Sequence, residues 1–192
     1  MRTLHIHSIV LFLSILCMRA HAGYTHYFTW HQRPDGAALK LCVSELRAII
    51  EARTNILTGP AGPGTMIVDS TNVDLNGLGD DAHEPFVFPG ELGFNFCKTE
   101  GKPYDAVVTA CLLVCRDHFP SSVLSIDSDG SWPDDWQDGI KLYSSVLGRT
   151  PQNPMSPLWR VVGWRYSIYV YVPAAILLVL GIWFLWKMRK KY

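Results

Sequence analysis

A long run without charged side chains constrains the organisation of this chain most strongly. Residues 168–186 are nineteen uncharged, mostly apolar positions near the C-terminus. At a rise of about 1.5 Å per residue, a helix of this length reaches about 28 Å and spans the hydrocarbon layer of a bilayer. Aromatic residues at both ends of the run favour a transmembrane helix over the alternative of a buried core helix. These residues are Trp164, Tyr166, Tyr169, Tyr171, Trp183 and Trp186.

A shorter apolar segment lies at the N-terminus. Arg2 precedes an apolar stretch at residues 9–18, and Ala20-His21-Ala22 has the small-x-small pattern of a signal-peptide cleavage site. An uncleaved anchor is the alternative, but this stretch is shorter than the roughly 20 residues that span a bilayer. We therefore expect residues 1–22 to be a signal peptide.

The basic residues indicate the orientation of the chain. Residues 187–192 contain four Lys or Arg, against two in residues 160–167. The positive-inside bias then places residues 187–192 in the cytoplasm and the preceding domain in the periplasm or outside the cell. The sequence thus predicts a single-pass membrane protein with an extracytoplasmic domain, whose contact with the lipid bilayer is made by residues 168–186.

The predicted extracytoplasmic part is acidic. Residues 23–150 contain nine Lys or Arg and seventeen Asp or Glu, a net charge of −8. Such a domain repels the phosphodiester backbone, so we expect no nucleic-acid partner.

Hydrophobic periodicity predicts one α+β domain at residues 23–147. Helices are expected after the N-cap Asp35, at 103–118 and at 134–147. Strands are expected at 24–30, 66–75, 86–88, 94–97 and 123–126. This order favours an antiparallel or mixed sheet with helices mainly on one face. Residues 148–167 form a Pro-rich linker and juxtamembrane segment, extended in its first part.

Four short motifs resemble, in order and spacing, a family of small uncharacterised proteins from bacteria and their phages that open with Met-Gly-Tyr-Thr-His-Tyr. The motifs are Gly-Tyr-Thr-His-Tyr at 23–27, Asn-Gly-Leu-Gly-Asp-Asp-Ala-His-Glu at 76–84, Phe-Cys-Lys-Thr at 96–99 with Lys-Pro-Tyr-Asp at 102–105, and Ser-Asp-Gly at 128–130. The resemblance covers residues 23–147, and the family has no established activity. Its members start at the Met before that Gly, so the leader and the anchor depart from the family pattern.

Basic residues near a helix start indicate an anion site. Lys98, Thr99 and Lys102 precede a helix whose first turn contains Tyr104 and Asp105. A helix N-terminus presents unpaired N–H groups, so a phosphate or a carboxylate is a suitable ligand. The alternative is that both lysines are solvated and that Asp105 complements the helix dipole. Tyr24 and His26 of the first motif are further ligand-binding candidates, unless His26 only lines the sheet.

A catalytic alternative uses Cys97. A thiolate–imidazole pair of Cys97 and His83, with Glu84 orienting the ring, would make the protein an enzyme that acts on an anionic small molecule. A packed or cross-linked Cys97 is the competing interpretation. An exposed cleft joining these segments would favour the enzyme, whereas burial of their side chains in mutual hydrogen bonds would favour a structural role.

The remaining cysteines leave two alternatives open. Cys42, Cys97, Cys111 and Cys115 are either cross-linked in an oxidising compartment or buried as free thiols. No Cys-x-x-Cys pair or His-rich spacing is present, so we expect no metal site, and no cofactor is predicted. The sequence therefore predicts a tethered binding or accessory domain, with an anionic small ligand or a protein as its partner.

Overall fold

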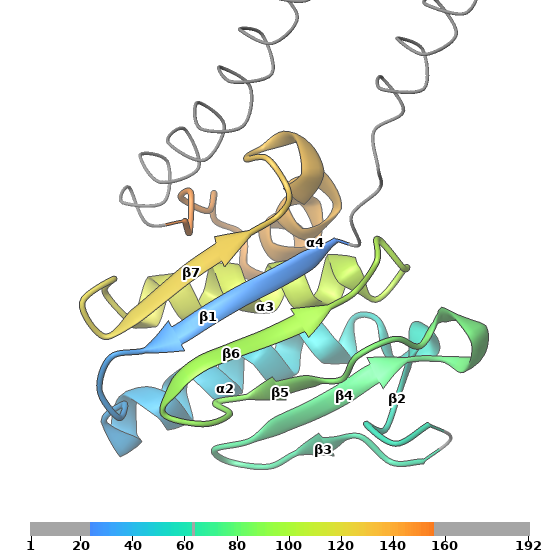
Figure 1. Cartoon of the computed structure of the whole chain (residues 1–192), viewed down its shortest axis with the longest axis horizontal. Coiled ribbons are helices and arrows are strands. Elements are labelled where there is room, and N and C mark those ends of the chain that lie inside the picture. Colours follow the sequence, from blue (N-terminus) through green and yellow to red (C-terminus); the bar gives the residue numbers. More distant parts are fainter. Residues whose placement is uncertain (1–23, 63, 156–192) are drawn as a thin grey trace, which may run out of the picture.

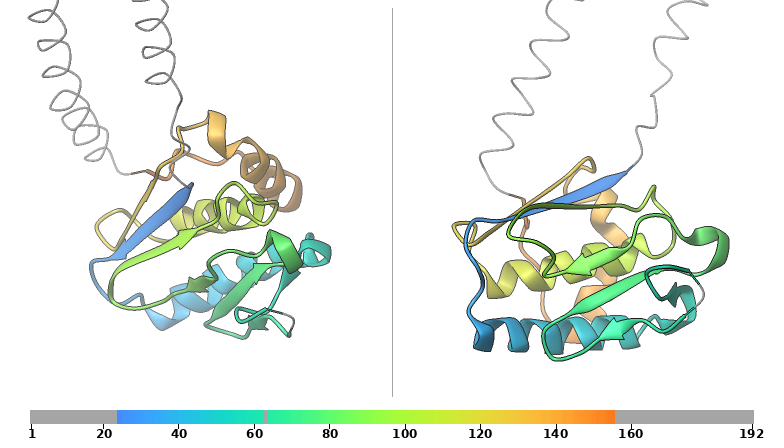
Figure 2. Two further views of the ribbon diagram at one scale, coloured as in Figure 1. Left: turned by 45° about the vertical axis from the view of Figure 1, so that its right-hand side comes forward. Right: turned by 60° about the horizontal axis from the view of Figure 1, so that its bottom comes forward.

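The computed structural model describes residues 24–62 and 64–155. It is a small α+β domain with antiparallel sheets and with helices on one side of the strands (Figures 1 and 2). The predicted α+β class is confirmed. The predicted signal peptide, transmembrane helix and basic tail lie outside the described residues. Among the residues that the structure describes, no helix is both long and apolar enough to cross a membrane.

The first sheet has three strands with β1 (Thr25–Trp30) in the middle. It pairs antiparallel with β6 (Gly93–Lys98) on one side and with β7 (Leu124–Ser128) on the other. Alternation along β1 buries His26, Phe28 and Trp30 against the helices. Tyr27 and Thr29 therefore point from the opposite face, which none of the described helices covers in Figure 1.

The second sheet is built around β4 (Val73–Gly77), which pairs with β2 (Leu57–Thr58), β3 (Ile67–Val68) and β5 (Phe86–Phe88). An antiparallel or mixed sheet and one strand at 66–75 were predicted; the strands do pair antiparallel, but they form two sheets, and residues 66–75 divide into β3 and β4. The Asp69 carboxylate accepts hydrogen bonds from the backbone N–H groups of Thr71 and Asn72, and this turn separates β3 from β4. The two-residue β2 was not predicted because it is too short for an alternating pattern.

The three helices form the second layer of the domain. The first, α2 (Gly36–Glu51), is capped as predicted, because the Asp35 side chain accepts from the N–H groups of Ala37 and Ala38. The second, α3 (Asp105–His118), is central and has an unbroken run of buried residues. The third, α4 (Gln137–Leu147), follows a 3₁₀ turn at Asp134–Trp136, where one continuous helix was predicted.

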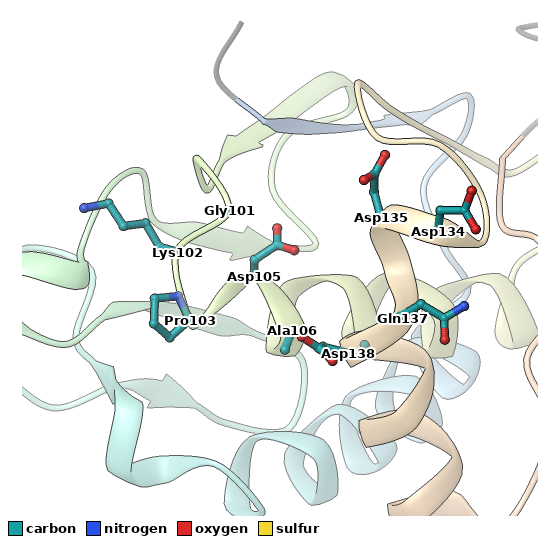
Figure 3. Close-up of a pocket in the computed structure, with 10 residues that line it drawn as sticks. Gly101, Lys102, Pro103, Asp105, Ala106, Asp134, Asp135, Gln137 and Asp138 are labelled. Atoms are coloured by element: carbon teal, nitrogen blue, oxygen red, sulfur yellow. The ribbon is translucent and has the colours of Figure 1, made fainter. Parts of the chain in front are cut away.

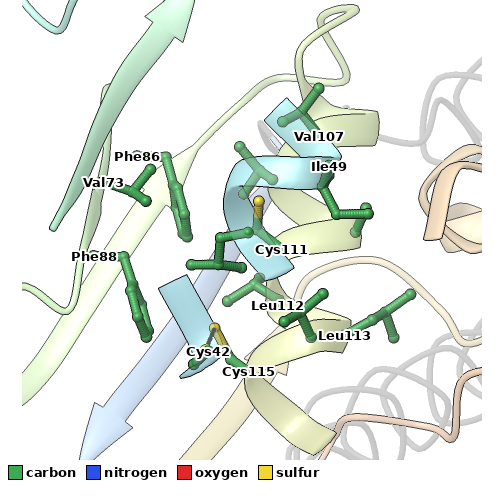
Figure 4. Close-up of a cluster of buried hydrophobic side chains, with 14 of the residues drawn as sticks. Cys42, Ile49, Val73, Phe86, Phe88, Val107, Cys111, Leu112, Leu113 and Cys115 are labelled. Carbon is green, nitrogen blue, oxygen red and sulfur yellow. Dashed lines mark hydrogen bonds between the residues drawn. The ribbon is translucent and has the colours of Figure 1, made fainter. Parts of the chain in front are cut away.

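The hydrophobic core lies between the sheets, α2 and α3 (Figure 4). All four cysteines between residues 24 and 155 are buried there as free thiols. The Sγ atoms of Cys42 on α2 and Cys115 on α3 are 4.0 Å apart. The free-thiol alternative therefore describes this structure.

The first residues of the predicted linker pack on the domain. Pro151 and Pro154 are buried, and Met155 pairs with Ile126 beside β7. The Arg149 guanidinium binds Glu45 of α2 and lies 2.9 Å from Asp117 Oδ2 of α3. Residues 149–155 thus contact the folded domain, although the sequence predicts a linker that begins at residue 148.

Candidate functional site

The four sequence motifs meet at one end of the first sheet. The backbone N–H groups of Thr99 and Glu100 both donate to the Tyr24 carbonyl oxygen, at 3.0 and 3.1 Å. Gly130 lies under the Tyr24 ring so closely that a Cβ atom at this position would lie 2.2 Å from the phenolic oxygen. Gly77 similarly packs against Tyr104. The motifs are far apart in the chain and are brought together by the pairing of β1 with β6 and β7.

A hydrogen-bonded cluster is centred on Asp105. His26 Nε2 lies 2.7 Å from Asp105 Oδ1, and the Thr99 hydroxyl donates to the same oxygen. The His26 and Thr99 side chains are fully buried. The His26 ring packs edge-on against Tyr24 and Trp136. This cluster connects β1, the end of β6 and the first turn of α3.

The Tyr24 hydroxyl belongs to the same region. It donates to the Asp135 carbonyl oxygen at 2.6 Å and so attaches β1 to the turn before α4. Burial, together with the nearby carboxylates of Asp105 and Asp135, raises the pKa of Tyr24 above its ordinary value. The phenol therefore stays protonated and acts as a hydrogen-bond donor.

Cys97 lies in a second buried cluster. Its Sγ atom contacts the Glu84 carbonyl oxygen at 3.5 Å, and Tyr104 donates to the same oxygen at 2.8 Å. The Glu84 carboxylate accepts from the Lys98 backbone N–H at 2.9 Å. Burial, reinforced by the charge of Glu84, raises the pKa of the Cys97 thiol well above its ordinary value. A fully buried, protonated thiol is a poor nucleophile.

His83 has a different partner. Its Nε2 atom lies 3.1 Å from Glu100 Oε1, and the side chain is partly exposed. Cys97 has its hydrogen bond with Glu84 instead, so the arrangement does not contain the predicted thiolate–imidazole pair. Glu84 uses its carboxylate on the β6 backbone and does not orient the His83 ring.

The two lysines of the predicted anion site are also engaged. Lys98 Nζ lies 3.2 Å from Glu100 Oε1, and Lys102 Nζ donates to the Asp80 carbonyl oxygen at 2.8 Å. Figure 3 shows the Lys102 side chain directed away from the pocket beside Asp105. This pocket has a volume of about 170 Å³, and most of its charged lining residues are acidic. They are Asp105, Asp134, Asp135 and Asp138. Their charge disfavours an anion at the start of α3.

The motif residues thus share burial and mutual hydrogen bonds. His26, Cys97, Thr99 and Tyr104 are all fully buried. This is the arrangement expected for a structural role, in which the cluster holds the ends of β1 and β6 against the start of α3.

A different surface has the properties of a binding site. On the uncovered face of the first sheet, Phe94 and Phe96 are 64% and 53% exposed. The Phe94 ring stacks on Tyr27 with ring centroids 5.9 Å apart and on Phe96 at 6.1 Å. We call this surface the open face and define it by Tyr27, Thr29, Phe94, Phe96, Ser125, Asp127 and Asp129.

A pocket of about 330 Å³ lies on the open face over β1 and β7. Tyr27 and Phe94 contribute aromatic rings, and Asp127 and Asp129 contribute carboxylates. The Tyr27 hydroxyl donates to both oxygens of Asp129, at 3.1 and 3.2 Å. Burial raises the pKa of Asp127, a backbone hydrogen bond at Ser128 partly offsets this, and the charge of Asp129 raises it further.

Phe94 and Phe96 were not predicted as binding residues from the sequence. Apolar residues occupy both faces of β6, since Cys97 is buried while Phe94 and Phe96, which point to the opposite face, are exposed. Alternation identifies two faces but does not say which one the helices cover. One signal was present in the sequence. In an edge strand such as β6, the positions that face solvent are usually polar, but here they are Phe94 and Phe96.

Comparisons with protein-family models, with curated proteins and with solved structures found no match for this chain.

Proposed function

We propose that this chain is a membrane-tethered, extracytoplasmic binding domain that contacts its partner through the open face. The observation that carries the proposal is the pair of exposed, stacked rings of Phe94 and Phe96 on a sheet face that no helix between residues 24 and 155 covers. The uncovered face of an antiparallel sheet usually carries polar side chains. Exposed apolar clusters with a polar rim instead mark interaction surfaces.

The composition of the open face supports this proposal. Aromatic side chains occupy β1 and β6, and the polar residues Thr29, Ser125 and Asp127 lie beside them on β1 and β7. Aromatic centres surrounded by polar rims are typical of protein interfaces. Tyr and Phe rings also bury a large area at a small cost in side-chain entropy.

The enzyme alternative, with Cys97 and His83, has less support. The Cys97 thiol is fully buried and its pKa is raised, and His83 is bound to Glu100. An anionic small ligand is also less suited to the open face, because the acidic residues of its pocket are Asp127 and Asp129. These features favour a binding domain over a cysteine-dependent enzyme.

Tethering is proposed from the sequence. Residues 168–186 are the proposed transmembrane helix, and the leader at 1–22 together with the basic tail places the domain outside the cytoplasm. A tethered domain meets partners confined near the same membrane at a raised effective concentration. Tethering would therefore raise the occupancy of a weak contact through the open face.

Photo-crosslinking in native membranes tests the proposal. The photoreactive amino acid p-benzoylphenylalanine replaces Phe94 in the full chain or, as the control, Leu41 on α2, which is also 64% exposed. We expect a discrete adduct from position 94, with a lower yield in Phe96→Ala, and no such adduct from position 41. Equal adducts from both positions, or none from position 94, would refute the proposal.

A further inference from the structure

In the described part of the chain, the carboxylates of the open-face pocket have no basic partner. Among residues 24–62 and 64–155, neither Asp127 nor Asp129 takes part in a salt bridge. Asp129 accepts hydrogen bonds from the neutral Tyr27 hydroxyl. Two neighbouring negative charges without a counter-charge leave a negative potential in the pocket.

The basic groups on the same face are held elsewhere. Lys98 is paired with Glu100, and His31 Nε2 lies 3.0 Å from the Ser125 hydroxyl oxygen. Neither contacts Asp127 or Asp129. Within residues 24–62 and 64–155 no basic side chain neutralises the pocket, so its charge favours a cationic ligand.

The aromatic wall of the pocket is suited to an organic cation. The Tyr27 and Phe94 rings lie 5.9 Å apart with an angle of 26° between their planes. The faces of such rings attract a cation, and the aliphatic stem of a basic side chain packs on them favourably. Hard metal cations instead require six or more oxygen ligands. The described part of the chain contains no group of three or more His, Cys, Asp or Glu side chains able to hold a metal.

The extent of the open face indicates a macromolecular carrier for this cation. Phe96 is 53% exposed and stacks on Phe94, but it does not line the pocket. A small free amine would fill the pocket and leave Phe96 uncovered. A protein partner can cover Phe96 with its own apolar surface while one basic side chain enters the pocket.

Hydrogen bonding within the pocket favours lysine over arginine. A guanidinium binds best to a carboxylate that offers both oxygens to its fork. Both oxygens of Asp129 already accept from Tyr27. A compact ammonium group, by contrast, fits between two separate carboxylates.

We propose that the pocket binds a lysine side chain of a protein partner, with the ammonium group between Asp127 and Asp129 and the butyl stem against Tyr27 and Phe94. This inference rests on the proposed function of the open face and assigns the chemistry of its partner. The volume of about 330 Å³ is sufficient for such a side chain.

Fluorine NMR on the full chain in lipid nanodiscs tests this inference. The chain is labelled with 4-fluorophenylalanine, and the Phe94 signal is identified by its loss in Phe94→Leu. The probes are n-butylammonium as the lysine side-chain analogue, n-butylguanidinium and the neutral n-butanol. We expect a saturable shift of the Phe94 signal with n-butylammonium at millimolar concentration and weaker binding of the other two probes.

Two variants provide the matched comparison. Asp127→Asn is expected to lower the affinity for n-butylammonium about tenfold, because one charge contact is lost. Asp138→Asn removes an equivalent charge from α4, where Asp138 is paired with Lys141, and is expected to change nothing.

The outcomes separate this inference from the proposed function. Equal binding of n-butanol, or no shift with any probe while the crosslink at position 94 still forms, refutes the cation pocket and leaves the open face as a binding surface. Tighter binding of n-butylguanidinium refutes the choice of lysine. A saturable, Asp127-dependent shift without any crosslink supports the pocket chemistry and refutes the proposed protein contact.

Discussion

His26 on β1 and Asp105 in the first turn of α3 are joined side chain to side chain, with Nε2 2.7 Å from Oδ1. The two residues are 79 positions apart, and their contact fixes the central strand of the first sheet to the most buried helix. The Thr99 hydroxyl completes the contact from the end of β6. Three elements thus depend on one carboxylate.

Removal of this carboxylate is expected to destabilise the domain. Asp105→Ala leaves the buried polar groups of His26 and Thr99 without their acceptor, so the free energy of unfolding should fall by about 2–3 kcal/mol. Urea denaturation followed by tryptophan fluorescence measures this. The exposed Asp138→Ala serves as control and should stay within about 0.5 kcal/mol of the parent chain. Equal stability of Asp105→Ala and the parent chain would contradict the structural role of the cluster.

Removal of the Asp127 carboxylate is expected to have the opposite effect and to stabilise the domain at pH 7. Its pKa is raised in the folded domain from the ordinary value of 3.8, mainly by burial and further by the charge of Asp129, against one backbone hydrogen bond at Ser128. The folded state therefore binds the proton more tightly than the unfolded state, and stability is lost as the pH rises from 3.8 through the raised pKa. Asp127→Asn should consequently unfold at a higher temperature than the parent chain at pH 7.

The gain in Asp127→Asn should vanish below pH 3, where the parent carboxyl group is also neutral. Thermal unfolding at both pH values measures the difference, with Asp138→Asn as the control of equal charge change. If Asp127→Asn stabilises the domain and also weakens the binding of n-butylammonium, the Asp127 carboxylate lowers stability and favours ligand binding. A loss of stability in Asp127→Asn at pH 7 would speak against this assignment.

The cysteine thiols are expected to be unreactive in the folded protein. Cys42, Cys97, Cys111 and Cys115 are fully buried, and burial raises the pKa of the Cys97, Cys111 and Cys115 thiols. A maleimide reagent should therefore modify none of the four before unfolding and all four in denaturant, as counted by mass spectrometry. Rapid modification of Cys97 in the folded chain would reopen the enzyme alternative.

The contact of Arg149 with Glu45 is expected to stabilise the domain in a pH-dependent way. Burial alone would raise the pKa of Glu45, but hydrogen bonds from Arg149 and His118 outweigh it and lower the pKa from its ordinary value of 4.5. A lowered pKa contributes stability that is present above about pH 4.5 and lost as the pH falls through the folded value.

Glu45→Gln should therefore lower the free energy of unfolding at pH 7 by about 1 kcal/mol, a value typical of a partly buried ion-pair network. The deficit should shrink towards pH 2. Chemical denaturation at the two pH values measures it, and Glu51→Gln on the exposed end of α2 is the control. A deficit that does not depend on pH would mean that the contact acts through packing and not through charge.

Local patterns predicted most of the secondary structure. The Asp35 cap, the apolar stripe of α2 and the continuously buried α3 depend on neighbours within a few residues, so the sequence reveals them. The split of residues 66–75 into β3 and β4 was missed, although Asp-Ser-Thr-Asn at 69–72 interrupts the apolar pattern with turn-forming side chains. The burial of Pro151 and Pro154 was not predicted, because it depends on contacts with elements that are distant in the sequence.

The candidate site was predicted in part. The residues of the motifs do come together, but they form structural contacts. Cys97 contacts the Glu84 carbonyl oxygen, and His83 is paired with Glu100. Distances between side chains from different strands depend on register, which a single sequence does not specify. The open face was not predicted, because the rings of Phe94 and Phe96 would look the same in a sequence whether or not a helix covered them.

The sequence by itself determined the helices, the Asp35 cap and the acidic character of the domain, and it is the basis for proposing a leader and an anchor, because these features depend on local periodicity and composition. Only the tertiary structure decided that Cys97, Thr99 and Tyr104 are buried and that Phe94, Phe96 and Asp127 lie on one uncovered surface. The physical reason is that burial is a property of the layer packed against a strand. The three helices pack on one side of the first sheet. Residues on that side therefore form the buried, hydrogen-bonded cluster, and residues on the other side form the open face.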